Sequence, residues 1–198
     1  AVDFLMVQLS ELRTSSPFTA ISRSREATAE RYEAYVRRSS KSEGGKKTAK
    51  KSADAKVRIA IISADFNKAI VGPMTDAALF TVKALGCDIG PVISVPGCIE
   101  IPLILDAVLQ RNDVDAVAVL GYIERGETQH GEVMGHVVYK AMTDLSLMYG
   151  KPVGLGIIGP GATLKQAKKR NVAYGTAAVE AAVRSLACLE EAQAEASV

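Results

Sequence analysis

The feature that most constrains the fold is a regular alternation of short apolar runs and helical patterns, which begins at residue 57. Four runs have the length and the β-branched content of buried strands, at residues 57–63, 89–95, 114–120 and 152–158. Helical periodicity follows each run, over residues 73–85, 99–109, 130–149 and 163–189, with a break expected near 171–175. Almost wholly apolar strands are typical of a parallel sheet that is covered on both faces. We therefore predict a three-layer α/β domain with a four-stranded parallel sheet flanked by helices.

The first 56 residues differ from this domain in composition. They hold 12 basic and 7 acidic residues, whereas residues 57–198 hold 12 basic and 15 acidic residues. Residues 24–38 favour a short helix with Ala29, Tyr32 and Val36 on one face, and it is either a marginal solvated helix or a docking helix for another protein. Residues 39–56 are rich in Lys, Ser and Gly, which predicts a flexible linker. We therefore divide the chain into a basic N-terminal arm, 1–56, and a domain, 57–198.

Bulk composition excludes several classes of protein. The chain has no run of about 18 apolar residues, so we expect no membrane span. The arm lacks aromatic residues among its linker lysines on which bases could stack, so we do not expect nucleic-acid binding. Its three cysteines, Cys87, Cys98 and Cys188, form no Cys-x-x-Cys pair, which disfavours zinc and fits a reducing, cytoplasmic setting.

The polar turn that follows the third strand is the strongest candidate for chemistry. Residues 120–130 read as a strand end, a glycine-bearing turn and the first residue of a helix, His130. In an open α/β sheet, ligands bind where the carboxyl ends of the strands gather, and residues 66–67, 97–100 and 159–162 occupy the equivalent turns. Free backbone N–H groups in Gly126-Glu127-Thr128 could hold an anion. His130 is either a proton acceptor or simply the residue that starts the helix, and His136 is expected to be solvated or packed; we predict no metal site.

A glycine pattern near the fourth strand has the wrong context for a dinucleotide site. Gly154, Gly156 and Gly159 form a GxGxxG, but they lie within the predicted strand, and the next helix should open at Thr163 with Gln166 as its capping partner. We therefore do not predict a dinucleotide site here. The following basic cluster comprises Lys165, Lys168, Lys169 and Arg170. It is either a solvated helix face or, through Arg170, a phosphate contact.

Four motifs in this order carry a family resemblance. They are Ala64-Asp65-Phe66-Asn67, the run from Val95 to Leu103 that contains Pro96-Gly97-Cys98-Ile99-Glu100, Arg125-Gly126-Glu127-Thr128-Gln129-His130, and Gly150-Lys151-Pro152-Val153 with Leu155 to Gly159. Together they resemble lumazine synthase (6,7-dimethyl-8-ribityllumazine synthase), especially its archaeal branch, over about residues 57–189. The domain would then be flavodoxin-like.

The resemblance implies a transferase of riboflavin biosynthesis. Members of the family condense 5-amino-6-ribitylaminouracil with 3,4-dihydroxy-2-butanone 4-phosphate and release phosphate and water, without a metal or redox cofactor. They assemble as homopentamers, and often as an icosahedral capsid built from pentamers. An alternative is a shell-forming scaffold of the same fold whose N-terminal arm docks a partner or cargo, and a third is a pterin- or flavin-binding relative without synthase activity.

Site residues follow from the matched motifs. His130 resembles the general acid/base. The phosphate-binding residues would be Gly126, Glu127, Thr128 and Arg170, and those that hold the pyrimidine and ribityl chain would be Phe66, Asn67, Cys98, Ile99, Glu100, Ile123 and Leu155. The resemblance also implies that Leu155 and Arg170 come from a neighbouring subunit. Departures from the family pattern occur at Glu124, Gly131 and Tyr174, and residues 1–56 have no usual counterpart.

Overall fold

The computed structural model describes residues 56–195. The helix predicted over 24–38, and the linker predicted from residue 39 up to residue 55, lie outside the described residues. The description below therefore concerns the domain alone.

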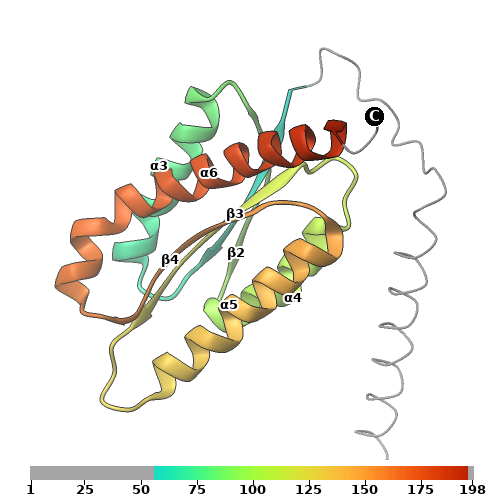
Figure 1. The fold of residues 1–198 in the computed structure, drawn as a ribbon. Coiled ribbons are helices and arrows are strands. Elements are labelled where there is room, and N and C mark those ends of the chain that lie inside the picture. Colours follow the sequence, from blue (N-terminus) through green and yellow to red (C-terminus); the bar gives the residue numbers. More distant parts are fainter. Residues whose placement is uncertain (1–55, 196–198) are drawn as a thin grey trace, which may run out of the picture. The chain divides into compact units, whose positions relative to one another are not determined.

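A four-stranded parallel sheet forms the middle layer of the domain (Figure 1). Its strands are β1 (Arg58–Ala64), β2 (Asp88–Val95), β3 (Ala116–Glu124) and β4 (Val153–Ala162), in the order β2-β1-β3-β4. The helices are α3 (Lys68–Ala84), α4 (Ile101–Leu109), α5 (His130–Tyr149) and α6 (Leu164–Glu195), with a 3₁₀ turn, η1 (Cys98–Glu100), before α4. The predicted three-layer α/β fold is confirmed.

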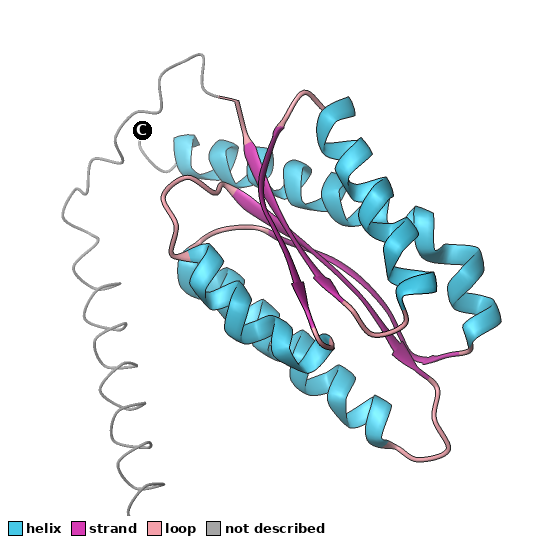
Figure 2. Ribbon diagram, turned by 180° about the vertical axis from the view of Figure 1, so that it is seen from behind, coloured by secondary structure: helices cyan, strands magenta, loops and turns pink. Residues whose placement is uncertain are grey.

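Each face of the sheet has its own apolar core, because successive strand residues point to opposite faces. Ile59 and Ile61 of β1 belong to the core under α3 and α6, whereas Ala60 and Ile62 belong to the core under α4 and α5. All four side chains are fully buried. The same two layers of helices appear on either side of the twisted strands when the domain is seen from behind (Figure 2). This two-sided burial explains why the strand sequences are almost continuously apolar.

Two helix boundaries differ from the sequence prediction. Helix α3 begins at Lys68, before Pro73, which lies inside the helix. The buried side chains of Ile70 and Val71 anchor this early turn, so packing outweighs the main-chain hydrogen bond that proline cannot make. The break predicted near residues 171–175 was wrong, because α6 is continuous. Both the third and the fourth strand also run beyond their predicted ends.

Glycines let α6 lie directly against the layers beneath it. A Cβ at Gly175 would clash with the backbone oxygen of Met74 in α3, and a Cβ at Gly154 would clash with the backbone oxygen of Ala178. Gly175 therefore marks a close helix crossing rather than the end of a helix. The GxGxxG pattern lies wholly within β4, as predicted, and its first glycine serves the contact with α6.

We predict unequal effects for two glycine-to-alanine substitutions inside helices. Gly175→Ala should lower the free energy of unfolding by about 2–3 kcal/mol, because a methyl group cannot be accommodated against the α3 backbone. Gly72→Ala in α3 should change it by less than about 0.5 kcal/mol, because the space around Gly72 is open but an alanine Cβ would crowd the ring of the following Pro73, which offsets the helix preference of alanine. Thermal unfolding of both variants beside the parent chain checks this, and a stable Gly175→Ala variant would contradict the close crossing.

Within residues 56–195, one helix is long and apolar enough to cross a membrane by length and composition. Its stretch Leu164–Ala194 has a mean hydropathy of 1.2 over the qualifying window, of which 22% is buried. The apolar character comes largely from alanines, and two charged residues, Glu180 and Arg184, lie within the apolar stretch near the middle of the helix. Its buried face, which includes Val179 and Ala182, packs against the sheet and α3. These contacts are those of a helix that covers a sheet.

Candidate active site

The end of β1 presents an aromatic side chain at the carboxyl edge of the sheet. Phe66 is 50% exposed, and its N–H donates to the oxygen of Pro96 at 3.1 Å, which ties this turn to the end of β2. Asn67 is the one non-glycine residue with positive φ in the described chain, at φ 62° and ψ 58°. Asparagine tolerates this left-handed conformation, which turns the chain directly into α3.

The turn after β2 buries one predicted site residue and exposes another. The thiol of Cys98 donates to the oxygen of Tyr122 at 3.8 Å, and burial raises the pKa of Cys98 to about 11. Its Sγ occupies the space above Gly121, where a Cβ would lie 2.5 Å away. Ile99 is half-exposed and Glu100 is partly buried. Cys98 thus forms part of the floor beneath the edge, while Ile99 and Glu100 are accessible on it.

The loop between β3 and α5 is exposed along residues 124–130. Thr128 Oγ1 accepts a hydrogen bond from the N–H of His130 at 3.4 Å. His130 is the first residue of α5, and no group in the described part of the chain pairs with its imidazole. Ile123, by contrast, is fully buried, so its side chain belongs to the core and not to the exposed edge. The loop therefore exposes its backbone and the imidazole of His130 to solvent.

Two predicted site residues lie apart from these three turns. Leu155 is in the middle of β4, opposite Val119, and is 42% exposed. Arg170 lies on the exposed face of α6, where its Nη1 donates to the oxygen of Gln166 at 3.3 Å. The predicted capping pair is present, since Thr163 N–H donates to Gln166 Oε1 at 2.9 Å and Gln166 N–H donates to Thr163 Oγ1 at 3.3 Å.

Two tyrosines that the sequence analysis did not single out hold the end of β4. Tyr122 Oη donates to the oxygen of Ala162 at 3.0 Å, from the side of the sheet covered by α3 and α6. Tyr139 Oη lies 2.9 Å from the oxygen of Ile157 and 3.1 Å from that of Gly159, on the α5 side. A tyrosine in an apolar stripe indicates a buried ring, but the sequence does not show which group its hydroxyl contacts.

A hollow of about 670 Å³ lies elsewhere, on the outer face of α6 between Ala177 and Leu189. None of the predicted site residues lines it. Three of the predicted residues, Phe66, Ile99 and His130, are instead accessible on an open edge of the sheet. The described residues would therefore contact a small substrate on that edge from one side and leave its other side open.

The motifs at this edge fall within a match to a known family. A model of the family 6,7-dimethyl-8-ribityllumazine synthase matches residues 56–190. The chain belongs to the lumazine synthase family. The protein of that name from Metallosphaera sedula is 45% identical over 131 residues, which are 66% of this chain and 87% of the relative. The one from Methanococcus maripaludis strain C7 is 40% identical over 137 residues, 69% of this chain and 99% of the relative. The one from Staphylothermus marinus is 43% identical over 129 residues, 65% and 86% respectively.

The lumazine synthase match includes all three turns at the carboxyl edge, together with Leu155 and Arg170. Residues 1–55 precede the matched range. The Methanococcus relative is 99% covered by 137 residues, which are 69% of this chain, so about a third of the chain lies outside that alignment.

Proposed function

We propose that the chain is a 6,7-dimethyl-8-ribityllumazine synthase, which condenses 5-amino-6-ribitylaminouracil with 3,4-dihydroxy-2-butanone 4-phosphate in riboflavin biosynthesis. The observation that carries the proposal is the loop 126–130. It combines exposed backbone N–H groups, suited to a phosphate, with an unpaired histidine at the start of a helix. The half-exposed ring of Phe66 lies on the same edge and is suited to stacking on a pyrimidine.

Different residues at this edge would bind the substrates and transfer protons. The 5-amino group of the pyrimidine attacks the ketone carbon, and loss of water leaves an imine. Elimination then releases the phosphate and leaves an enol that tautomerises to a ketone. Attack of the 6-ribitylamino nitrogen on this carbonyl, with loss of a second water, closes the new ring. His130 carries protons to and from the reacting atoms, while Gly126, Glu127 and Thr128 hold the leaving phosphate. These are steps for an acid/base group and an anion site, which is what the edge offers.

We propose further that the working form is a homo-oligomer in which Leu155 and Arg170 of one subunit complete the edge of the next. Leu155 is an exposed apolar side chain on the outer strand of the sheet, away from its own carboxyl edge. Helix α5 also exposes apolar side chains on its outer face, among them Val133, Val137 and Leu147, at 59%, 53% and 74%. Such a surface is typical of a contact with another copy. Assembly of five subunits, and of pentamers into a shell, is the form that family membership favours.

The proposed activity is tested by mixing the purified chain with both substrates and following the fluorescence of the lumazine product. Formation of the product with release of one phosphate per turnover is expected. Absence of product with correctly assembled protein would refute the proposed function and leave the scaffold or the flavin-binding relative in its place.

Residues 1–56 are proposed to be a docking arm for a partner protein or cargo. The arm is additional to the matched domain, and its net basic charge contrasts with the mildly acidic domain. Deletion of residues 1–50 should therefore leave synthase activity and particle size unchanged and abolish only the association with the partner or cargo. Pull-down from the source cytoplasm with the full-length and shortened chains measures this, and equal recovery of every protein would contradict the proposal.

A further inference from the structure

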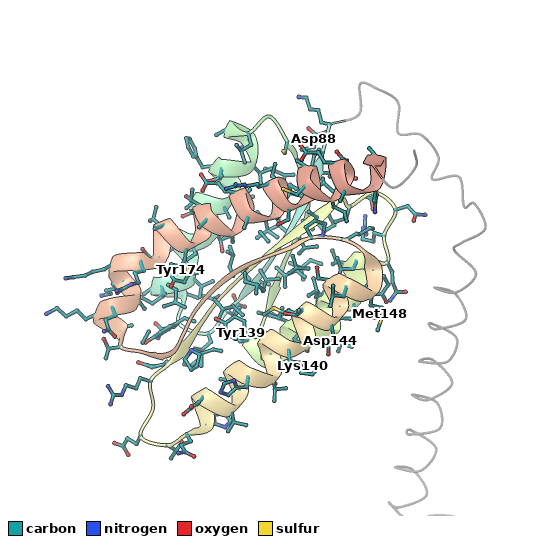
Figure 3. The ribbon with its side chains drawn as sticks, in the orientation of Figure 1. Asp88, Tyr139, Lys140, Asp144, Met148 and Tyr174 are labelled. Carbon is teal, nitrogen blue, oxygen red and sulfur yellow. The ribbon has the colours of Figure 1, made fainter. Side chains whose placement is uncertain are left out.

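One face of α5 meets the ends of β3 and β4 through three residues spaced by four. These are Gly131, Gly135 and Tyr139, which lie one above the other on the helix. Tyr139 lies on the side of the helix that faces the sheet, whereas Lys140, the next residue, is exposed (Figure 3). We call Gly131, Gly135 and Tyr139 the inner face of α5.

The two glycines allow a close approach, into which a Cβ would fit only if its neighbours shifted. A Cβ at Gly131 would lie 3.0 Å from the oxygen of Glu124 and 3.4 Å from Cγ2 of Ile123. A Cβ at Gly135 would lie 2.9 Å from Cδ of Pro160. The first two turns of α5 therefore rest against the end of β3 and against the proline at the end of β4. Gly131, a departure from the family pattern, has here a direct steric reason.

Tyr139 fixes the same surface by hydrogen bonding. Its hydroxyl is shared between the oxygens of Ile157 and Gly159, at 2.9 and 3.1 Å. Burial raises the pKa of Tyr139 to about 12, so the hydroxyl remains a donor throughout the neutral range. The hydroxyl thus connects α5 to the second half of β4.

The end of β4 is itself held by hydrogen bonds, so it is a fixed surface against which α5 can pack. The pairing of β3 with β4 shifts between Tyr122 and Glu124, because β4 carries extra residues there. Beyond this irregularity, the oxygen of Ala162 accepts hydrogen bonds from Tyr122 Oη at 3.0 Å and from the N–H of Arg125 at 3.1 Å. The irregular end of β4 is thereby fixed from β3 and from α5 at once.

We infer that the inner face of α5 is the device that positions His130 for proton transfer, with Tyr139 as a positioning residue. The inference rests on the proposed function, in which His130 is the acid/base group. His130 is adjacent to Gly131, and no described side chain holds its imidazole, so the placement of the helix start sets the position of the ring. A displacement of about 1 Å in a reacting group can lower a rate about a hundredfold.

The test compares two tyrosine-to-phenylalanine substitutions on the same helix. Tyr139→Phe should lower kcat about tenfold and leave KM for the pyrimidine within about twofold, because the binding residues in the turns after β1 and β2 are untouched. The control is Tyr149→Phe, which removes a hydrogen bond to Asp106 Oδ1 of 2.7 Å at the other end of α5. It should lower thermal stability by a similar amount and leave kcat unchanged. Equal kcat values for the two variants would overturn the inference.

A second measurement asks whether Tyr139 acts through His130. In a His130→Ala background, Tyr139→Phe should have no further effect on kcat, whereas an independent role would again give about a tenfold decrease. Gly135→Ala, which displaces α5 from Pro160 without removing a hydrogen bond, should behave like Tyr139→Phe in both backgrounds. A His130→Ala variant with full activity would overturn both the proposed role of His130 and this inference. If His130→Ala lowers kcat as expected but Tyr139→Phe leaves kcat unchanged, the inference is overturned and the proposed function is not.

Discussion

Replacement of His130 by alanine should lower kcat for lumazine formation about a hundredfold or more. General acid/base catalysis contributes about 10²–10⁴-fold, and His130 is the exposed histidine on the same sheet edge as Phe66 and Ile99. KM should change little, because the proposed binding groups are Phe66 and the backbone of the loop. Steady-state fluorescence measurements of product formation give both constants.

The matched control is His136→Ala. His136 is the second histidine of α5, it is also exposed, and its Nε2 lies 4.0 Å from Oε1 of Glu132. Both substitutions remove an exposed side chain, so each should change the free energy of unfolding by no more than about 0.5 kcal/mol. Full activity of His130→Ala, or an equal loss in His136→Ala, would refute the assignment of His130. A residual rate in His130→Ala is expected, since substrate positioning contributes independently.

Co-assembly of two defective variants should restore activity if the site lies between subunits. Arg170→Ala alone should lower kcat/KM for the phosphate substrate about tenfold to a hundredfold, through loss of a charged hydrogen-bond donor. In a ring assembled from equal amounts of His130→Ala and Arg170→Ala chains, about a quarter of the sites would contain both residues, because each site takes one from each neighbour. Activity should therefore rise to about a quarter of that of the parent protein.

Coexpression with two different affinity tags, followed by sequential purification, isolates the mixed assemblies. The control is a mixture of the two variants purified separately, which should remain at the level of the variants. Mixed assemblies that are no more active than this control would show that His130 and Arg170 serve the same site from one chain. Light scattering on the same samples gives the particle size, and a particle no larger than one subunit would contradict the shared site outright.

The topology could be predicted because it depends on a pattern that is repeated along the whole domain. Each apolar run had to be buried on both faces, and each helical stripe supplied one covering layer. Pro73 and Gly175 were misread because proline and glycine are also the usual signals of helix ends. At Gly175 the glycine instead permits contact with the backbone of Met74, and sequence periodicity carries no information on the distance between two helices.

The candidate site was predictable to the level of the edge, but not to the level of each side chain. Phe66, Ile99 and His130 are exposed where the motifs place them. Cys98 and Ile123 were also predicted to bind substrate, yet their side chains are buried, because whether a residue at a strand end is buried depends on what packs above it. Tyr139 lies nine residues after His130 in the chain, and only the return of β4 beside α5 shows that they belong to one arrangement.

The parallel topology also places the proposed active-site edge and the two ends of the described chain on opposite sides of the domain. Strand β1 begins, and α6 ends, at the side of the domain opposite the loop that leads to His130 (Figure 1). Segments joined at either end of the described chain start from that far side. Such segments could therefore be exchanged or lengthened without any change to the residues of the proposed active-site edge.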